Sequence, residues 1–414
     1  MPIRFDGQVA IVTGAAGGLG QAWARELHGR GASCILVDID PRVLQIEKPS
    51  QPTSSTAKWT GVVANCADEK AGRQVVETVL ATFGRVDILL HASTQVQDAS
   101  FRKMTREQWN SVLENDLTSA FTMTRAVWTA MRQQNYGRIL LCTSASGLYG
   151  NFGQVNYATT KSGVWGLTKA LSIEGRKYKI GVNAIAAVAG TTLTQTVMPK
   201  DVFDRLKPEY TSPFVVYLCH GSNNENGSIF ETGGGWIGKL RLQRSSGVGF
   251  PLATSPEVVA AAWDQVVDFS EASYPASTQD SFMPMLQNAN YPPTTLKTPH
   301  ADAVVAVFDR LRSTLARRRQ PLRASGVLEW AIGNATFTID LKTNSVHHGG
   351  RSDVGGADLI VTMTEHDFLE LAAGTLRLQQ AMASNKLKLK GDIKLAMGLR
   401  HLLTLFQEQP ASKL

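Results

Sequence analysis

Long apolar runs are absent from this chain of 414 residues. No stretch approaches the ~18 consecutive apolar residues that a membrane-spanning helix needs. The beginning, MPIRFDGQVAIVTG, also lacks the charged start, apolar core and cleavage site of a secretory signal. We therefore expect neither a transmembrane nor a secreted protein.

Cysteine is scarce, and metal-binding patterns are missing. The four cysteines (Cys34, Cys66, Cys142 and Cys219) are scattered without a CxxC pair. This usage is typical of reduced intracellular thiols rather than of a disulfide framework. Among the histidines there is no HExxH motif, and the adjacent pair His347-His348 points its side chains apart. We predict no metal site.

Charge is moderate and unevenly distributed. Hydrophobic residues make up 43% and charged residues 19%, a globular composition, and the length predicts two or three domains. The net charge is +7, and residues 297–414 hold 16 basic and 11 acidic side chains. The longest basic cluster, Arg317-Arg318-Arg319, has no interleaved aromatic residues. We interpret this cluster as a solvated helix face, and we therefore expect no nucleic-acid partner.

The first 190 residues alternate apolar runs with amphipathic ones. Six runs are typical of strands: QVAIVTG, ASCILVDID, KWTGVVAN, VDILLHA, GRILLCTSA and IGVNAIA. The stretches 18–29, 70–83, 105–133 and 155–178 between them are typical of helices. This alternation predicts an α/β fold with a doubly wound, Rossmann-like parallel sheet. Apolar strands without polar alternation indicate that both faces of the sheet are covered.

A second pattern begins after a segment rich in Pro, Ser, Thr and Gly. We place the domain boundary near 290–298. A helix is expected over about 300–318, followed by strands that alternate, with Phe337 and Ile339 facing one way and Thr338 and Asp340 the other. One buried and one solvated face predict a smaller α+β domain.

A glycine-rich turn, Thr13-Gly14-Ala15-Ala16-Gly17-Gly18-Leu19-Gly20, follows the first strand and opens a helix. Such a turn lets backbone N–H groups approach a pyrophosphate. The spacing does not match GxGxxG and instead resembles the TGxxxGxG turn of short-chain dehydrogenases/reductases. A purely structural strand-to-helix turn would look similar. The candidate cofactor-binding residues here are Gly14, Gly18, Leu19 and Gly20.

The second strand ends at Asp38, eighteen residues after Gly20. A carboxylate there accepts hydrogen bonds from ribose hydroxyls and repels a 2′-phosphate. Ala16, Gly17 and Ile39 offer no base for that phosphate, although Arg42 lies nearby. NAD is therefore favoured over NADP as the cofactor.

Tyr157 and Lys161 stand four residues apart in NYATTKSG, so they share one helix face. A neighbouring ammonium favours the phenolate of a tyrosine, which then serves as an acid/base for a hydroxyl/ketone pair. Ser144 lies thirteen residues earlier, at the end of a strand, where its hydroxyl can hydrogen-bond the reacting oxygen. A helix-surface Tyr and Lys is the structural alternative.

Residues 1 to about 287 resemble the dehydrogenase portion of the peroxisomal multifunctional enzyme type 2 family, for example through TVMPKDVFDRLKPEY and NGSIFETGGGWIGKL. In that family this domain oxidises (3R)-3-hydroxyacyl-CoA to 3-ketoacyl-CoA with NAD. The resemblance implies that Tyr157 takes the hydroxyl proton, Lys161 holds the nicotinamide ribose and favours the phenolate, and Ser144 orients the substrate oxygen. It also implies a homodimer formed through this domain.

Three segments depart from the family pattern. His91-Ala92-Ser93-Thr94 replaces the usual NNAG, and Ala187-Val188-Ala189-Gly190 replaces a Pro-Gly type of turn. After that turn, Thr191 or Thr194 is expected to contact the nicotinamide carboxamide.

The third departure is Asp116, which stands where an Asn commonly anchors a water of the proton relay. A carboxylate can also hold a water. Its negative charge, however, would oppose phenolate formation at Tyr157 if the two groups lie close together.

Residues from about 300 to 408 resemble the sterol carrier protein type 2 family. The stretch that carries the resemblance is DLIVTMTEHDFLELAAGTLRLQQAMASNKLKLKGDIKLAMGLRHLLTLF. The resemblance implies a lipid- or acyl-CoA-binding domain, which the basic excess suits. Met363, Met382 and Met397 either line an apolar tunnel or simply fill a small core. The linker leaves no room for the hydratase domain that separates the two units in multifunctional enzyme type 2.

The chain ends in Ser412-Lys413-Leu414, a peroxisomal address that an import receptor reads. A solvated end without meaning is the alternative. We therefore expect localisation to the peroxisome or a related organelle, with the import receptor as a partner.

The predicted domains are thus an NAD-binding dehydrogenase (1–290), a sterol-carrier-type lipid-binding domain (298–410) and a targeting tail (411–414). The leading hypothesis is an NAD-dependent (3R)-3-hydroxyacyl-CoA dehydrogenase of fatty-acid β-oxidation with an attached carrier. One alternative is a lipid-transfer protein whose dehydrogenase domain is weakly active or inactive. Another is a short-chain dehydrogenase acting on steroids or other lipid alcohols.

Overall fold

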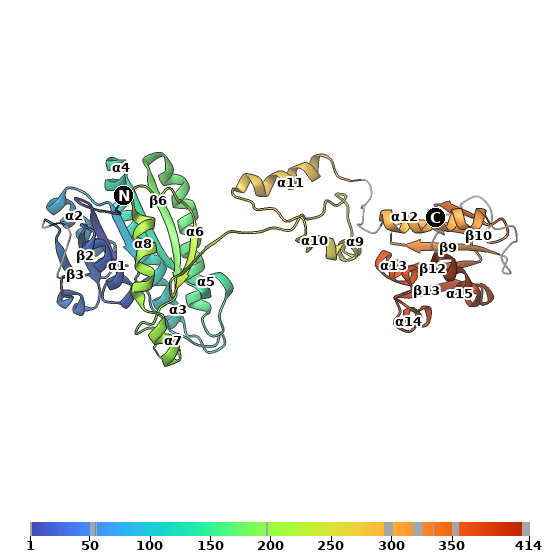
Figure 1. The fold of residues 1–414 in the computed structure, drawn as a ribbon, viewed down its shortest axis with the longest axis horizontal. Helices are drawn as coiled ribbons and strands as arrows, with labels where there is room; N and C mark the ends of the chain where they lie inside the picture. Colours follow the sequence, from blue (N-terminus) through green and yellow to red (C-terminus); the bar gives the residue numbers. More distant parts are fainter. Residues whose placement is uncertain are drawn as a thin grey trace. The chain divides into compact units, whose positions relative to one another are not determined.

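The computed structural model describes residues 2–49, 54, 56–195, 198–293, 301–317, 326–333, 335–349 and 356–407. By its internal contacts the chain divides into two compact units, Met1–Arg241 and Leu242–Leu414. Each unit is described by itself below (Figure 1). The domain boundary predicted near 290–298 runs into residues outside the described ranges and stays a prediction. The targeting tail 411–414 also lies outside them.

The first unit is built on an eight-stranded sheet with the order β3-β2-β1-β4-β5-β6-β7-β8 (Figure 1). Strands β1 to β7 pair in parallel, and β8 pairs antiparallel to β7 at the edge. The strands are β1 (Val9–Thr13), β2 (Ser33–Asp38), β3 (Trp59–Val63), β4 (Ile88–His91), β5 (Gly137–Thr143), β6 (Ile180–Ala187), β7 (Ile229–Gly233) and β8 (Trp236–Leu240). Six of them were predicted; the short β7–β8 hairpin was missed.

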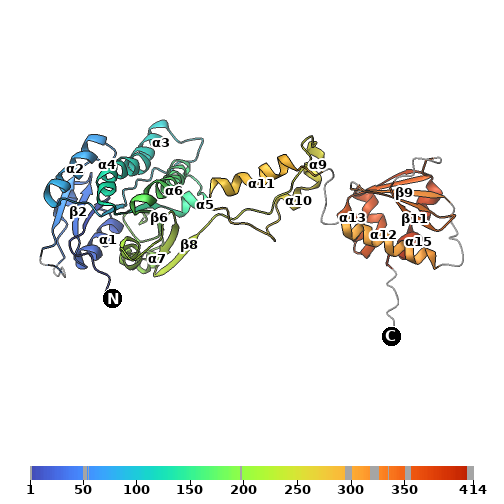
Figure 2. The same cartoon turned by 90° about the horizontal axis from the view of Figure 1, so that it is seen from above.

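Helices cover both faces of this sheet (Figure 2). Alternate residues of β1 point to opposite sides, so that Ala10 and Val12 join one buried core while Val9 and Ile11 join another. The first core includes α1 and α8, and the second includes α2, α4 and α6. The doubly wound prediction is confirmed. The helices are α1 (Gly18–Gly29), α2 (Glu69–Phe83), α3 (Arg106–Leu113), α4 (Ser119–Gln134), α5 (Ala145–Tyr149), α6 (Val155–Gly175), α7 (Lys200–Arg205) and α8 (Ser212–Cys219), with 3-10 turns at η1 (Pro41–Gln45), η3 (Arg176–Tyr178) and η4 (Pro208–Thr211).

One predicted helix is interrupted in a way that matters for function. The stretch 105–133 forms α3 and α4 with a π-helical turn, η2 (Glu114–Thr118), between them. Single π-turns inside helices occur frequently at functional sites. Asp116 lies in this turn and is fully buried.

The second unit contains a five-stranded sheet with the order β11-β10-β9-β12-β13. Strands β9 and β12 pair in parallel, and the other pairs are antiparallel. The strands are β9 (Val327–Ile332), β10 (Ala335–Asp340), β11 (Ser345–His348), β12 (Leu359–Met363) and β13 (Leu387–Gly391), and the helices are α9 (Pro256–Ala261), α10 (Trp263–Val266), α11 (Thr278–Asn290), α12 (Ala301–Ala316), α13 (Glu365–Ala373), α14 (Leu378–Ala383) and α15 (Ile393–Gln407). The predicted α+β fold is confirmed.

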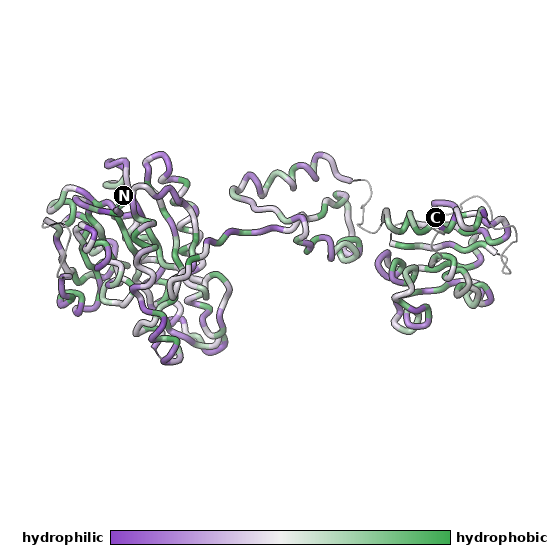
Figure 3. The backbone as a smooth tube through the Cα atoms, viewed as in Figure 1, coloured by the Kyte–Doolittle hydropathy of each residue, from purple (hydrophilic) through white to green (hydrophobic). Residues whose placement is uncertain are grey.

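Aromatic rings form the centre of the second unit's core. Phe308 of α12 stacks on Phe337 with 3.9 Å between ring centroids, and Trp330, Phe368 and Phe406 pack around this pair. In Figure 3 the central strands of the first unit's sheet are predominantly hydrophobic.

Two details of the second unit differ from the sequence predictions. Thr338 and Asp340, predicted on the solvated face of β10, are both buried, and the Thr338 hydroxyl donates to the carbonyl of Gly349. Met363 is buried, but Met382 and Met397 are 49% and 79% exposed, so those two neither fill the core nor line an enclosed tunnel. Among the described residues no helix is long and apolar enough to cross a membrane.

Candidate active site

The glycine-rich turn between β1 and α1 packs directly against neighbouring backbone. Gly14 has φ +65°, and a Cβ there would lie 2.5 Å from the backbone nitrogen of Ser93. A Cβ on Gly20 would lie 2.5 Å from the carbonyl oxygen of Gly14. Glycine is therefore required at both positions, because any side chain would push the turn open.

Asp38 lies at the end of β2, beside this turn. One of its carboxylate oxygens accepts a hydrogen bond from the backbone N–H of Ala16 (2.9 Å), and the other accepts from that of Asp40 (3.0 Å). The Arg42 guanidinium donates to Asp40 at 2.7 Å and lines the same cleft as Asp38. A cleft of about 390 Å³ runs along the turn and Asp38. These residues fit a dinucleotide whose adenosine ribose meets a carboxylate.

A second cleft, of about 430 Å³, contains Ser144, Tyr157 and Lys161. The two clefts adjoin each other, as their shared lining residues show. These are Leu19, Ala92, Thr94, Thr191 and Leu193. Helix α6 places Tyr157 and Lys161 one turn apart, with the Lys161 ammonium 5.4 Å from the centre of the Tyr157 ring. Ser144 is the N-cap of α5, and its oxygen accepts from the backbone N–H of Gly147 at 3.2 Å.

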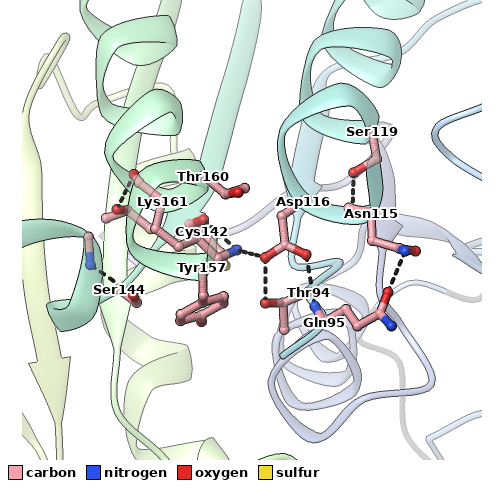
Figure 4. A network of polar contacts seen from close by, with 12 residues as sticks. Thr94, Gln95, Asn115, Asp116, Ser119, Cys142, Ser144, Tyr157, Thr160 and Lys161 are labelled. Atoms are coloured by element: carbon pink, nitrogen blue, oxygen red, sulfur yellow. Dashed lines mark hydrogen bonds and ion pairs between the residues drawn. The ribbon is translucent and has the colours of Figure 1, made fainter. Parts of the chain in front are cut away.

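Lys161 forms a fully buried ion pair with Asp116 (Figure 4). Its Nζ lies 2.9 Å from Oδ2 of Asp116 and 3.2 Å from the Cys142 carbonyl oxygen, to which it donates. Both side chains are at most 1% exposed. Burial is the largest single influence and lowers the pKa of Lys161, but the charge of Asp116 and its hydrogen bond, together with Tyr157 and Cys142, more than offset it, so the pKa of Lys161 is raised overall.

The loop after β4 supplies the other partners of the Asp116 carboxylate. The Thr94 hydroxyl donates to Oδ2 at 2.8 Å, and the backbone N–H of Gln95 donates to Oδ1 at 2.8 Å (Figure 4). Together with Lys161, these donors bind both oxygens of the carboxylate. The side chain that was expected to anchor a relay water is instead held by the protein itself.

His91, at the end of β4, replaces the first residue of the usual NNAG and is buried. Its Nδ1 lies 2.7 Å from the Thr13 hydroxyl, and its Nε2 lies 3.0 Å from the Ser119 hydroxyl. Burial, with a further contribution from the Lys161 charge, lowers the pKa of His91 to about 3. The ring is therefore neutral at physiological pH, and it links β1 to α4 beneath the glycine-rich turn.

The structure thus brings the sequence-predicted residues Ser144, Tyr157 and Lys161 together around one cleft, with the buried Asp116 paired to Lys161. Gly14, Gly18, Leu19, Gly20, Asp38 and Thr191 line the adjoining cleft. Sequence reasoning missed that Thr94 and Gln95 hold Asp116. The departure from NNAG was the available signal, because it placed a hydroxyl where glycine is usual. Within the described residues, no three His, Cys, Asp or Glu side chains are grouped so that they could hold a metal ion.

Comparison with known proteins agrees with this architecture. Residues 8–204 match the short chain dehydrogenase family, and residues 308–404 match the SCP-2 sterol transfer family. The crystal structure of a short chain dehydrogenase from Mycobacterium avium superposes with a TM-score of 0.54 at 28% identity, covering 64% of this chain and 97% of that one. Short-chain dehydrogenases generally use NAD or NADP.

Among full-length relatives, peroxisomal multifunctional enzyme A of Dictyostelium discoideum is 34% identical over 97% of this chain and 99% of its own length. Peroxisomal multifunctional enzyme type 2 of Mus musculus is 44% identical over 68% of this chain, and the peroxisomal hydratase-dehydrogenase-epimerase of Neurospora crassa is 40% identical over 69%. The matches cover only 39% and 33% of those two relatives' lengths. The chain therefore belongs to the family of peroxisomal multifunctional enzymes, as a short-chain dehydrogenase domain joined to an SCP-2 domain.

The buried, neutral His91 should make the protein sensitive to acid. Its pKa is lowered from 6.5 to about 3 on folding, so the unfolded chain binds the extra proton first. Its contribution to stability is complete above about pH 6.5 and is lost as the pH falls toward 3, by up to about 1.4 kcal/mol per pH unit. In His91→Asn, urea unfolding at pH 7, 6, 5 and 4 should show a shallower loss of unfolding free energy than the wild type. His347→Asn, at an exposed position, is the control; equal slopes in His91→Asn and wild type would contradict the assignment.

Proposed function

We propose that this protein is a peroxisomal, NAD-dependent (3R)-3-hydroxyacyl-CoA dehydrogenase of fatty-acid β-oxidation with an attached lipid or acyl-CoA carrier domain. The observation that carries the proposal is the meeting of Ser144, Tyr157 and Lys161 in a cleft that adjoins the glycine-rich turn. The names of the relatives, which join peroxisomal location to dehydrogenase activity, support it.

The proposed chemistry is the oxidation of a secondary alcohol. The Tyr157 phenolate oxygen takes the proton of the 3-hydroxyl group as the C–H bond to carbon 3 breaks and the ketone forms. The Ser144 hydroxyl orients the reacting oxygen, and the Lys161 ammonium favours the phenolate. NAD, when bound, supplies the hydride acceptor. In the reverse direction Tyr157 returns the proton to the ketone oxygen.

NAD rather than NADP is proposed because of Asp38. Its carboxylate is fixed by two backbone N–H groups, and the nearby Arg42 is committed to Asp40. A 2′-phosphate would therefore meet the negative charge of Asp38 and would have to compete with Asp40 for the Arg42 guanidinium, which lines the same cleft. Thr191, which lines both clefts, is the proposed contact for the nicotinamide carboxamide.

A second candidate function is a lipid-transfer protein whose dehydrogenase domain turns over slowly. The specific observation in its favour is the Lys161–Asp116 ion pair. In this pair the ammonium that should stabilise the Tyr157 phenolate is already bound to a carboxylate. A dehydrogenase acting on steroids or other lipid alcohols would use the same three residues. For all of these functions, the proposed partners are an acyl-CoA or lipid ligand, the peroxisomal import receptor and a second copy of the chain.

The dehydrogenase is tested by following NADH consumption with a 3-ketoacyl-CoA and, in parallel, with a ketosteroid. We expect turnover of the acyl-CoA substrate and a loss of about 10²–10⁴-fold in kcat for Tyr157→Phe, because the proton donor is removed. Tyr149→Phe is a matched control, since its hydroxyl is bound to Glu231 on an exposed surface. Binding of NADH without any turnover would favour the lipid-transfer function, and preferential turnover of the steroid would favour the third.

The cofactor proposal is tested with Asp38→Asn. Removing the negative charge should improve kcat/KM for NADPH relative to NADH by at least about tenfold, since the repulsion of the 2′-phosphate is lost. Steady-state kinetics with both cofactors gives this ratio. Glu77→Gln, which removes an exposed carboxylate on α2 outside the cleft, is the control. A wild type that already prefers NADPH would overturn the proposal.

Peroxisomal import is proposed to depend on Ser412, Lys413 and Leu414. A fluorescent protein fused in front of the full chain should give organellar puncta, and removal of these three residues should leave the fluorescence in the cytosol. Puncta that persist after the deletion would contradict the proposed signal.

A further inference from the structure

Two departures of this sequence from the family pattern meet at a single group, the Asp116 carboxylate. Asp116 stands in the π-turn η2, and Thr94 stands in the loop after β4, 22 residues earlier in the chain. The Thr94 hydroxyl donates to the same oxygen, Oδ2, that contacts the Lys161 ammonium. One oxygen of this buried carboxylate thus accepts from one neutral and one charged donor.

The Lys161 ammonium faces two groups that compete for its charge. On one side is the Asp116 carboxylate at 2.9 Å, and on the other is the Tyr157 ring, whose centre lies 5.4 Å away. Because both side chains of the ion pair are buried, solvent screens their interaction only weakly. An interaction that weakens the attraction between Asp116 and the Lys161 ammonium therefore lets the ammonium stabilise a phenolate at Tyr157 more strongly.

The Thr94 hydroxyl is placed to adjust this balance. A hydrogen bond donated to a carboxylate stabilises its charge and lowers the attraction that its oxygen exerts on a second donor. Thr94 also lines both clefts, so it lies at the junction between the dinucleotide and catalytic sites.

We propose that Thr94 and Asp116 are paired positioning residues: Asp116 holds the Lys161 ammonium, and the Thr94 hydroxyl limits how much of that ammonium's charge is withdrawn from Tyr157. This inference rests on the proposed function only in treating Tyr157 as the acid/base. It gives the departure from NNAG a purpose, because glycine in place of Thr94 would leave the carboxylate without this donor.

The ionisable groups around Tyr157 come from several elements. They are Lys161 on the same helix and Asp98, which lines the catalytic cleft and accepts from the Gln154 amide. Around Lys161 lie Asp116 on η2, His91 on β4 and Cys142 on β5. His91 stays neutral above about pH 3, and burial raises the pKa of Cys142 to about 12. Neither therefore changes charge between pH 5 and 10.

The test measures ionisation of Tyr157 directly, without turnover. Tyrosinate absorbance near 295 nm is followed from pH 5 to 10 in the full-length protein, and the same titration of Tyr157→Phe is subtracted. For each variant, the titration of its own Tyr157→Phe double mutant is subtracted in the same way. The variants are Asp116→Asn, Thr94→Val and Thr94→Ser, and thermal melting confirms that each is folded.

The two substitutions are expected to act in opposite directions. Asp116→Asn should move the Tyr157 ionisation to lower pH by about one unit, since a competing negative charge is gone. Thr94→Val should move it to higher pH by a few tenths of a unit, because the carboxylate then attracts Lys161 more strongly. Thr94→Ser keeps the hydroxyl and should match the wild type. The acid limb of the kcat profile should follow the same order.

Shifts in the same direction for Asp116→Asn and Thr94→Val, or no shift in either, would overturn the inference, because a merely structural network would behave in that way. If Asp116→Asn does not fold, the Thr94→Val and Thr94→Ser pair still decides the matter: Val must shift upward and Ser must not. Opposite shifts in a protein that fails to reduce 3-ketoacyl-CoA would support the inference and reject the proposed function. Turnover without the opposite shifts would do the reverse.

Discussion

The buried ion pair between Lys161 and Asp116 is the interaction on which the arrangement of the site depends. Taking two charges out of water costs several kcal/mol for each ion, and good geometry together with further hydrogen bonds must offset that cost. The protein offsets it with the Cys142 carbonyl at one end and with Thr94 and the Gln95 backbone at the other. The ion pair and its hydrogen bonds therefore connect four segments: helix α6, strand β5, the π-turn η2 and the loop after β4.

The loop after β4 serves both clefts through this network. The backbone of Ala92 and Ser93 lies so close to Gly14 that only glycine fits there. The next two residues, Thr94 and Gln95, donate hydrogen bonds to Asp116. His91 fastens the beginning of the loop to Thr13 and Ser119. The cofactor turn and the catalytic helix are thereby coupled through one short segment, so the unusual His91–Thr94 sequence is part of a consistent local design rather than a loss of structure.

The sequence predicted the fold well because the signals were local and repeated. Apolar strands alternating with amphipathic helices specify a doubly wound sheet, and β1 to β6 with their helices follow from that pattern. The π-turn at Glu114–Thr118 was not predicted, because residues 105–133 show one continuous helical pattern that does not mark the wider turn within it. The β7–β8 hairpin was missed because its strands are five residues each and glycine-punctuated.

For the site, spacing alone paired Tyr157 with Lys161 and linked Asp38 to the glycine-rich turn, but it gave no distances between separate elements. Asp116 was suspected as a hindrance to the phenolate, yet its partner Lys161 is 45 positions away and Thr94 lies on another loop. Such contacts depend on the register of β4 against β5 and on the turn in η2. Thr338 shows the same limit in the second unit, where the turn after β11 covers a face that alternation predicted to be solvated.

The most direct measurement of the central claim is the protonation of Lys161 itself, followed by NMR of ¹³Cε-labelled lysine and assigned by Lys161→Arg. If Asp116 holds the ammonium in a buried pair, the Lys161 signal should stay in its charged form beyond pH 10.5, the ordinary value for lysine. In Asp116→Asn the same signal should titrate at lower pH than in the wild type. A wild-type Lys161 that loses its proton below pH 10.5, or that titrates identically in both proteins, would contradict the account.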